Sequence, residues 1–507
     1  MVRHLNIHFN LLSLLLLLLI SWVQSKFETS SNTTISTGFS SSSSSPPSRV
    51  KCLPGFSGPL PFHLETGYIS VHISDEDSQS NNHDGDENIE LFYYFVKSER
   101  KPGEDPLVFW FTGGPRCSSL SALLFEIGPI TMDIAGYDGG LPKLVLNQNS
   151  WTKIANIIFP EAPVYTGFSY SRSSANLYVG DKESSKNSYE FVIKWLIRHP
   201  EFKSNPLYIG GDSYSGIIVP VVVQHLINDI QTQKYPFLNL KGYLLGNPLA
   251  QKELDINARV PYAYGMGLLS YELFESMKEN CKGKYLNFDL DNVKCSKDGQ
   301  KYQECISNIN TIHILEKHCD HLTPKPKPPT DNYRRSLSEL AEVLPPSEVD
   351  VPLIPGCPGQ NQDVLCGYWA NDDRVQEALH VRKETVKKWV RCNSDAPYKY
   401  DIYGISSSVE YHRNISTKLG YRSLIYSGDH DLVVPHISTE AWIRSLNLSI
   451  IDDWRPWLLD DQIAGYTRTY SSGLTYATVK GAGHTAPEYK HKECFAMFER
   501  WISHGPL

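Results

Sequence analysis

A sharp turn between two apolar runs constrains this chain more than any other feature. The residues Gly-Asp-Ser-Tyr-Ser-Gly at 211–216 follow the apolar run 207–209 and open the apolar run 217–223. Small residues at Gly211 and Ser215 allow the chain to fold back tightly, so the pattern predicts a strand, a turn that presents Ser213, and a helix. A serine hydroxyl is a poor nucleophile, so it needs a base, an orienting acid and donors for an oxyanion. An incidental serine in a glycine-rich turn is the alternative.

Two later loops supply candidates for the base and the acid. Asp431 ends the sequence Tyr-Ser-Gly-Asp-His-Asp at 426–431, and His484 lies in a glycine-rich loop at 480–487; each loop follows a strand pattern. His484 would accept the serine proton and later return one to the leaving group, while Asp431 would fix its tautomer and stabilise the imidazolium. Asp431 is preferred because it lies deeper in its loop, and Asp429 is the alternative. Neither a cofactor nor a metal is needed for this chemistry.

The oxyanion hole is predicted at residues 112–115, Thr-Gly-Gly-Pro, directly after the strand pattern at 106–111. A Gly-Gly pair lets backbone N–H groups approach a substrate oxygen without obstruction by side chains. We expect the N–H of Gly114 and the N–H of Tyr214, next to the nucleophile, to be the two donors.

Strands and helices alternate along most of the chain. Strand patterns cover residues 67–73, 90–96, 106–111, 156–159, 206–210, 238–245, 423–426 and 474–479, and helix patterns cover 184–198, 214–230, 372–380 and 487–502. This alternation predicts an α/β fold, with a mixed, mostly parallel sheet covered on both faces. Together with the order serine, aspartate, histidine, it indicates the α/β-hydrolase fold. We expect the core to comprise residues 51–250 and 368–507, interrupted at 251–367 by a helical cap that holds six of the ten cysteines.

The N-terminal sequence predicts entry into the secretory pathway. Arg3 and His4 precede an apolar run at 11–23, so residues 1–25 have the pattern of a signal peptide. We expect residues 26–50, rich in Ser, Thr and Pro, to form a disordered arm. No other segment has the length that a membrane span requires, so we expect a soluble mature protein. Glycosylation sequons occur at Asn32, Asn414 and Asn447. A net charge of −8 argues against nucleic acid or an anionic membrane as a partner.

The motifs together resemble the serine carboxypeptidase family from about Leu53 to the C-terminus. The resemblance is carried by Gly-Gly-Pro-x-Cys-Ser-Ser at 113–119, by the turn at 211–216, by Trp-Ala-Asn-Asp at 369–372, and by the two loops that hold Asp431 and His484. Several stretches are similar to the plant acyltransferases of this family, namely those at 109–114, 211–216, 453–457 and 465–470. The resemblance implies an acyl-enzyme that an alcohol or similar acceptor resolves, with the 1-O-β-glucose ester of a phenolic or related acid as donor. It also points to the vacuole as the destination, with secretion from the cell as the alternative.

Two positions favour transfer over peptide hydrolysis. Peptidases of the family hold the substrate's terminal carboxylate with an Asn before the Gly-Gly pair and a Glu before the nucleophile; here these positions are Thr112 and Asp212. Thr112 lacks the amide donor, and the carboxyl of Asp212 is drawn back by one methylene. A site discriminates strongly only when its hydrogen-bonding partners are in place, so this chain is expected to grip a peptide C-terminus weakly. The candidate substrate contacts are Thr112, Gly113, Asp212, Arg116 and Tyr165.

The resemblance further implies three disulfides. Cys117 would pair with Cys392, Cys281 with Cys295, and Cys319 with Cys357, leaving Cys52, Cys305, Cys366 and Cys494 over. A proline-rich, basic linker at 320–356 is either excised, giving two disulfide-linked chains, or is a plain surface loop.

Three departures from the family pattern lie near the predicted site. Arg116 replaces the glycine after Gly-Gly-Pro, at a position where a type II turn needs a positive φ. One alternative is that Arg116 bears about 1–2 kcal/mol of left-handed strain. The other is that the loop turns differently and moves Gly114. Tyr165 replaces another glycine, and Pro-Glu-Ala at 160–162 replaces Leu-Asp-Ser. These departures suit either an altered pocket or a subunit that has lost catalysis. The resemblance as a whole favours an acyltransferase. The alternatives are a serine carboxypeptidase and a non-catalytic companion that forms a heteromer with an active paralogue.

Overall fold

The structure is a computed structural model that describes residues 47–72, 88–172, 177–285, 291–319, 353, 355–396, 398–400, 404–418 and 421–507. The predicted signal peptide, most of the predicted arm, the sequon at Asn32 and nearly all of the linker at 320–356 lie outside these residues. Of the other sequons, Asn447 is exposed, whereas the side chain of Asn414 donates to Gln224.

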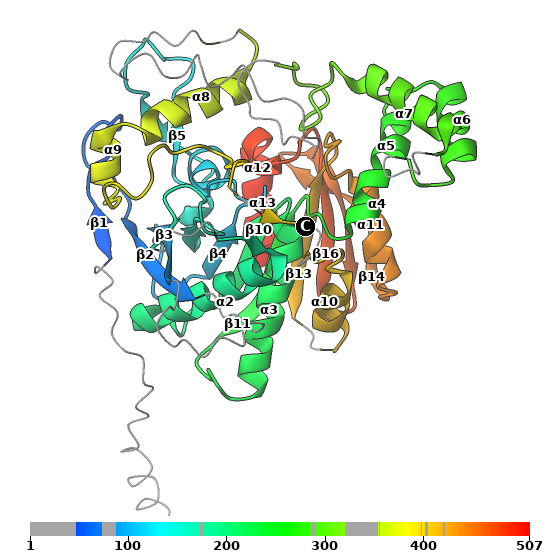
Figure 1. Cartoon of the computed structure of the whole chain (residues 1–507). Helices are drawn as coiled ribbons and strands as arrows, with labels where there is room; N and C mark the ends of the chain where they lie inside the picture. Colours follow the sequence, from blue (N-terminus) through cyan, green and yellow to red (C-terminus); the bar gives the residue numbers. More distant parts are fainter. Residues whose placement is uncertain are drawn as a thin grey trace, which may run out of the picture. The chain divides into compact units, whose positions relative to one another are not determined.

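The described residues are built around one large sheet, with the strand order β1-β2-β3-β7-β4-β10-β11-β13-β16-β15-β14 (Figure 1). The six central strands are parallel: β7 (Asn156–Pro160), β4 (Leu107–Phe111), β10 (Leu207–Asp212), β11 (Leu240–Gly246), β13 (Arg422–Gly428) and β16 (Leu474–Val479). The flanking strands pair antiparallel: β1 (Ser48–Val50), β2 (Leu64–His72), β3 (Asn88–Val96) and β8 (Tyr170–Ser171) on one side, and β15 (Gln462–Tyr470) and β14 (Ile450–Leu459) on the other. This confirms the predicted α/β-hydrolase fold.

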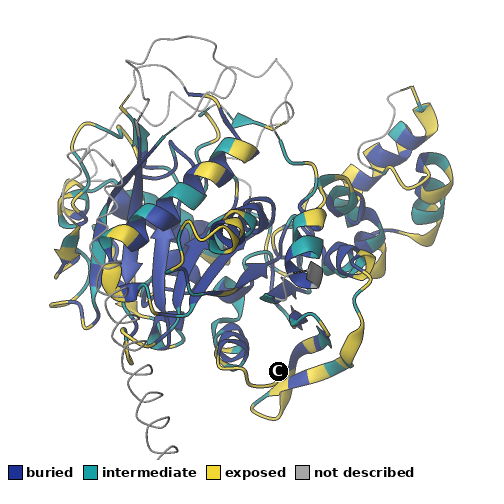
Figure 2. Cartoon of the chain, turned by 90° about the horizontal axis from the view of Figure 1, so that it is seen from below, coloured by how far each residue is buried: buried dark blue, intermediate teal, exposed yellow. Residues whose placement is uncertain are grey.

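Side-chain alternation along the parallel strands builds a core on each face of the sheet. In β4, Val108 and Trp110 belong to one buried cluster, while Leu107, Phe109 and Phe111 belong to the other. Helices α8 (Pro358–Ala370) and α13 (His491–Ile502) cover the first face, and α2 (Asp181–Arg198), α3 (Ser215–Gln231) and α11 (His436–Ser445) cover the second. Because both faces are covered, the central strands read as continuous apolar runs; they are the dark blue strands of Figure 2.

Helix α3 carries a proline, Pro220, in its interior. Pro220 has no N–H to donate to the carbonyl of Gly216, four residues earlier in the helix. The hydroxyl of Ser408 donates to that carbonyl instead, at 2.7 Å. A residue distant in sequence thus completes the first turns of the helix that follows Ser213.

Besides most of α8, the described part of the segment that we expected to form a cap contains four helices. They are α4 (Lys252–Asn257), α5 (Arg259–Gly265), α6 (Tyr271–Cys281) and α7 (Val293–Ile306), and α5 to α7 are grouped together in Figure 1. Their apolar residues form a third buried cluster, to which Leu432 of the acid loop belongs. Cys281 and Cys295 join α6 to α7, and Cys319 is bonded to Cys357. The cap therefore contacts the loop that carries Asp431.

The structure corrects two details of the predicted elements and adds one hairpin. Residues 48–50, expected in the disordered arm, form β1 because they pair with residues 64–66 of β2. The helix predicted at 487–502 is split into α12 (Ala486–Tyr489) and α13, since Lys490 has a non-helical backbone. The motifs at 453–457 and 465–470, which carried no secondary-structure prediction, form the hairpin β14–β15 at the sheet edge. Among the described residues, no helix has the length and apolar character needed to cross a bilayer.

Candidate active site

Ser213 lies at the turn between β10 and α3, as predicted. Its backbone has a φ of 54°, and its N–H donates to the carbonyl of Gly246 on the neighbouring strand at 2.9 Å. The predicted need for small residues has a direct cause. A Cβ on Gly211 would lie 2.3 Å from the carbonyl oxygen of Phe111, and the hydroxyl of Ser215 donates to that same oxygen at 2.8 Å. The turn is therefore built against the end of β4.

The structure brings the three predicted residues of the triad together. Nε2 of His484 lies 2.7 Å from Oγ of Ser213, and Nδ1 of His484 lies 2.7 Å from Oδ2 of Asp431. All three follow the carboxyl ends of parallel strands, β10, β13 and β16, which meet at one edge of the sheet. The alternative acid, Asp429, instead contacts Nδ1 of His430 at 2.6 Å and accepts from the N–H of Gly481 at 2.7 Å.

Asp431 is fully buried and is held by donors that the sequence analysis missed. Its Oδ2 accepts from Nδ2 of Asn247 at 2.9 Å, and its Oδ1 accepts from the N–H groups of Val433 and Val434 at 2.7 and 3.2 Å. Oδ1 of Asn247 accepts from the N–H of Gly428 at 3.1 Å, so this residue links the ends of β11 and β13. A polar residue directly after a buried strand was the only available signal.

The surroundings of His484 favour its protonated form. Burial disfavours the imidazolium, but the charge and hydrogen bond of Asp431 outweigh burial, and the carboxylate of Asp212 adds to their effect. The pKa of His484 is therefore raised above 6.5. A base of this kind accepts a serine proton readily and keeps the resulting charge beside Asp431.

The predicted oxyanion loop lies against the nucleophile. A Cβ on Gly113 would be 2.7 Å from Cβ of Ser213 and 2.8 Å from the backbone nitrogen of Tyr214. A side chain at this position would therefore displace the turn. Within the described residues, the N–H of Gly114 donates to no other group. The loop thus leaves one predicted donor available at the elbow.

Arg116 occupies the left-handed region with a φ of 70°, as the first alternative for this loop expected, although the turn also differs from type II. The closing hydrogen bond runs from the N–H of Cys117 to the carbonyl of Gly113 at 3.2 Å, which makes the turn one residue wider than a type II β-turn. Tyr165 is also left-handed, with a φ of 68°. Both residues that replace a family glycine, Arg116 and Tyr165, therefore adopt the left-handed backbone conformation that a glycine would favour.

Thr112 opens the oxyanion loop, and Asp212 lies against this loop. Oδ1 of Asp212 accepts from the N–H of Gly113 at 3.1 Å, and the side chain is buried. Burial raises the pKa of Asp212 to about 6, although the charge of His484 and the Gly113 N–H act in the opposite direction. Oγ1 of Thr112 is buried and has no hydrogen-bond partner among the described residues.

A second carboxyl group near Asp212 was not anticipated. Glu126 ends the apolar run after the oxyanion loop and is buried. Burial raises its pKa, and the neighbouring carboxylates of Asp212 and Glu488 raise it further. Burial thus makes both acids easier to protonate than an exposed carboxyl group.

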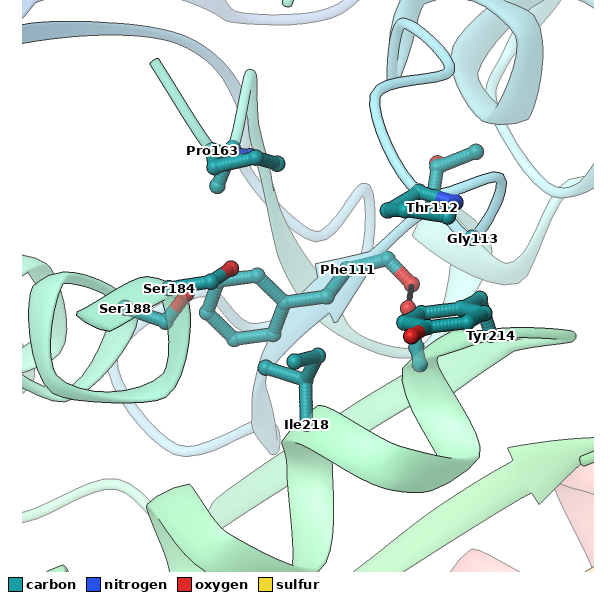
Figure 3. Close-up of a pocket in the computed structure, with 11 residues that line it drawn as sticks. Phe111, Thr112, Gly113, Pro163, Ser184, Ser188, Tyr214 and Ile218 are labelled. Carbon is teal, nitrogen blue, oxygen red and sulfur yellow. Dashed lines mark hydrogen bonds between the residues drawn. The ribbon is translucent and has the colours of Figure 1, made fainter. Parts of the chain in front are cut away.

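A small cavity adjoins the turn and is lined by residues that include members of β4, α2, α3 and the oxyanion loop. Figure 3 shows the ring of Phe111 pointing toward Ser184 and Ser188, with Tyr214 on the other side and Ile218 on α3 below. The cavity measures about 10 Å³, which is the space of one water molecule. It is too small for an acyl group, so the substrate must bind outside it.

Tyr214 is held by a buried carboxylate that the sequence analysis did not identify. Oδ1 of Asp181 accepts from the hydroxyls of Tyr214 and Tyr398 at 2.9 and 2.7 Å. Oδ2 accepts from Nζ of Lys252 at 3.0 Å and from the N–H of Ile405 at 2.8 Å. Asp181, at the first turn of α2, thus fixes the residue that follows the nucleophile.

The three disulfides implied by the resemblance are present. The bond between Cys117 and Cys392 ties the oxyanion loop to the segment beyond the cap, where the N–H of Ser118 also donates to the carbonyl of Arg391 at 2.6 Å. Of the four cysteines left over, Cys366 and Cys494 are buried thiols, and Cys52 and Cys305 are exposed.

Comparison with known proteins places this arrangement in a family. A family model described as serine carboxypeptidase matches residues 54–504. Serine carboxypeptidase-like 7 and serine carboxypeptidase-like 12 of Arabidopsis thaliana are each 49% identical, over 90% of this chain and 94% of their own length. Kex1(delta)p, a prohormone-processing carboxypeptidase from Saccharomyces cerevisiae, superposes with a TM-score of 0.66 at 18% identity over 87% of this chain and 92% of that protein, a likeness that concerns the fold. The chain belongs to the serine carboxypeptidase family.

Proposed function

We propose that this protein is an acyltransferase that moves an acyl group from a 1-O-β-glucose ester to an acceptor through an acyl-enzyme on Ser213. His484 removes the proton of Ser213 as its Oγ attacks the ester carbonyl. The oxyanion is held by backbone N–H groups of Gly114 and Tyr214, and His484 returns the proton to the departing glucose. The acceptor hydroxyl then gives its proton to His484 as it attacks the acyl carbonyl, and His484 passes this proton to Oγ of Ser213 as the serine ester bond breaks.

The observation that carries the proposal is how Asp212 uses its carboxyl group. Oδ1 of Asp212 accepts from the N–H of Gly113, and burial raises the pKa of this carboxyl group to about 6, which weakens it as a fixed anion. Thr112, beside it, has no amide to offer. The side chain of Asp212 is thus turned to the backbone and occupies a donor that a peptide carboxylate could use. These contacts favour a neutral ester over a peptide C-terminus as the donor substrate.

Transfer also requires that the acceptor, rather than water, reach the acyl carbonyl. An oriented neighbour can have an effective molarity of about 10⁵–10⁸ M, which exceeds the concentration of water by orders of magnitude. We propose that the reaction takes place in the secretory pathway, with the vacuole as the destination. The 2.7 Å contacts of His484 favour an active enzyme over a non-catalytic companion.

The test is to incubate the purified full-length protein with a panel of 1-O-acyl-β-glucoses and to record its intact mass. We expect the mass to increase by one acyl group, located on Ser213 by peptide mapping, and to return to its original value when an alcohol acceptor is added. Ser213→Ala should show no increase while keeping its melting temperature and its binding of the donor.

Two outcomes would contradict the proposal. Release of C-terminal residues from peptides at acid pH, with no acylation by any glucose ester, would identify a carboxypeptidase. Binding of acyl-glucoses without acylation of the wild-type protein would identify a companion subunit.

A further inference from the structure

The side chain of Arg116 is buried beside the oxyanion loop but lacks hydrogen-bond partners for much of its guanidinium. Its exposed fraction is 6%, and among the described residues Nε and Nη1 have no acceptor. A guanidinium remains charged in proteins and carries five N–H donors. A buried charge is costly unless it is paired and hydrogen-bonded. The structure therefore contains a cation whose bonding capacity is unused.

The residues that surround Arg116 do not neutralise it. Its guanidinium carbon lies 5.7 Å from the ring centroid of Tyr398, a cation–π contact that supplies no acceptor for Nε or Nη1. Burial raises the pKa of Tyr400, and the charge and hydrogen bond of Arg116 oppose that rise. Asp181, which accepts from the hydroxyl of Tyr398, already pairs with Lys252 at 3.0 Å. Within the described residues, Arg116 forms no ion pair of its own.

The position of Arg116 is rigidly determined. The N–H of Asn393 donates to the carbonyl of Arg116 at 3.0 Å, and Nδ2 of Asn393 donates to the carbonyl of Tyr165 at 2.8 Å. One residue therefore clamps both left-handed departures from the family pattern. The adjacent disulfide between Cys117 and Cys392 holds the same two segments together. Strain of this kind persists where the surroundings determine it, and it concentrates at functional sites.

Arg116 is also close to the reacting groups. It lies two residues after Gly114 in the loop that packs on Ser213. The rings of Tyr398 and Tyr400 that it contacts lie 6.3 and 6.0 Å from the ring of Tyr214, which follows the nucleophile. The backbone of Arg116 is therefore part of the loop beside the nucleophile, and its side chain contacts rings that lie next to Tyr214.

We propose that Arg116 binds a carboxylate carried by one of the two substrates, which makes this residue a determinant of specificity for acidic substrates. That the carboxylate belongs to an acyl donor or an acceptor rests on the proposed transferase function. The binding of a carboxylate by Arg116 does not. A carboxylate oxygen would accept from the unused N–H groups in charge-assisted hydrogen bonds, which are about twice as strong as neutral ones. It would also neutralise the buried charge.

Binding is tested first, with succinate as the carboxylate probe and neutral succinamide as its control. Isothermal titration is carried out on the full-length Ser213→Ala protein, with Arg116 intact or replaced. We expect succinate to bind, succinamide not to bind, and Arg116→Gln to weaken succinate by about tenfold or more, which corresponds to 1.4 kcal/mol. Arg374→Gln, on helix α9 (Asp373–Ala378), removes an arginine side chain that is 70% exposed and should change nothing.

Two arms then distinguish the source of the carboxylate in the catalytically intact protein. If the acyl group carries it, Arg116→Gln slows acylation by 1-O-succinyl-glucose but not by 1-O-butyryl-glucose. If the acceptor carries it, Arg116→Gln slows transfer to glycolate but not to ethylene glycol. Arg116→Gly, which suits the positive φ, serves where the Gln variant does not fold.

The inference is overturned if succinate fails to bind the parent protein, or binds Arg116→Gln and Arg116→Gly equally well. If glucose esters do acylate the protein, the inference is also overturned when neither arm shows an Arg116-dependent difference. Succinate binding that depends on Arg116, in a protein that no glucose ester acylates, would uphold the site while refuting the transferase. Acylation by a glucose ester, without succinate binding that depends on Arg116, would uphold the transferase and refute the Arg116 site.

Discussion

Replacement of Glu161 by Gln should make the free energy of unfolding less sensitive to rising pH. Glu161 is fully buried under the oxyanion loop. Its Oε1 accepts from the hydroxyls of Ser118 and Tyr94 at 2.7 and 3.1 Å, and its Oε2 accepts from the N–H of Ser119 at 3.1 Å. Burial raises its pKa from 4.5 to about 7, because it outweighs these three hydrogen bonds. The neighbouring titratable groups are Tyr94 and the thiol of Cys366, whose own pKa values burial raises.

The magnitude follows from linkage. A carboxyl group with a raised pKa stabilises the folded state fully below 4.5, and this contribution is lost as the pH rises through about 7. The shift corresponds to about 3 kcal/mol. Gln has nearly the same shape and does not titrate. The free energy of unfolding of Glu161→Gln, minus that of the wild type, should therefore increase by up to about 3 kcal/mol between acid and alkaline pH.

Urea unfolding with the disulfides intact, at about pH 5 and about pH 8, measures this difference. Glu104→Gln, at a side chain that is 74% exposed, is the matched control and should show no such change. If the difference between Glu161→Gln and the wild type is the same at both pH values, Glu161 does not ionise in this range and the reasoning is wrong. A lower stability of the variant at both values would not affect the test, since only the change with pH is at issue.

Three further predictions concern the reaction. Asn247→Ala removes a donor to the buried carboxylate of Asp431, and a hydrogen bond to a charged group contributes about 1.5–3 kcal/mol. We therefore expect kcat to fall by at least about tenfold with little change in KM. An unchanged kcat would show that Asn247 does not position the acid. Thr112→Asn combined with Asp212→Glu should raise peptide hydrolysis relative to acyl transfer, and a constant ratio in a folded protein would refute the argument about the carboxylate clamp. His484 acts as a base only when neutral, and its pKa is raised. We therefore expect kcat/KM to fall as the pH is lowered through a value above 6.5. If an NMR titration shows the same pKa of His484 in Asp431→Asn, the charge and hydrogen bond of Asp431 are not what raises it.

The sequence by itself determined the elements whose signals are local. The turn at Ser213 needs small residues at positions two before and two after it, and both are visible in the sequence. Asp431, His484 and the Gly-Gly pair each follow an apolar run, and parallel strands place their carboxyl ends at one edge of a sheet. The order of these segments along the chain was therefore enough to predict which residues meet at the site. Residues 48–50 were misplaced because a three-residue strand is defined only by its pairing with β2.

Tertiary structure decided the contacts that have no local signal. Asn247 reaches Asp431 across 184 positions, and Asp181 collects Tyr214, Tyr398 and Lys252 from separate segments. Asn393 joins the two left-handed departures only because the chain returns to the oxyanion loop beyond the cap. Such hydrogen bonds depend on position in space, which residue type and spacing do not encode. The sequence thus showed which groups could react, and packing alone decided which side chains hold them in place.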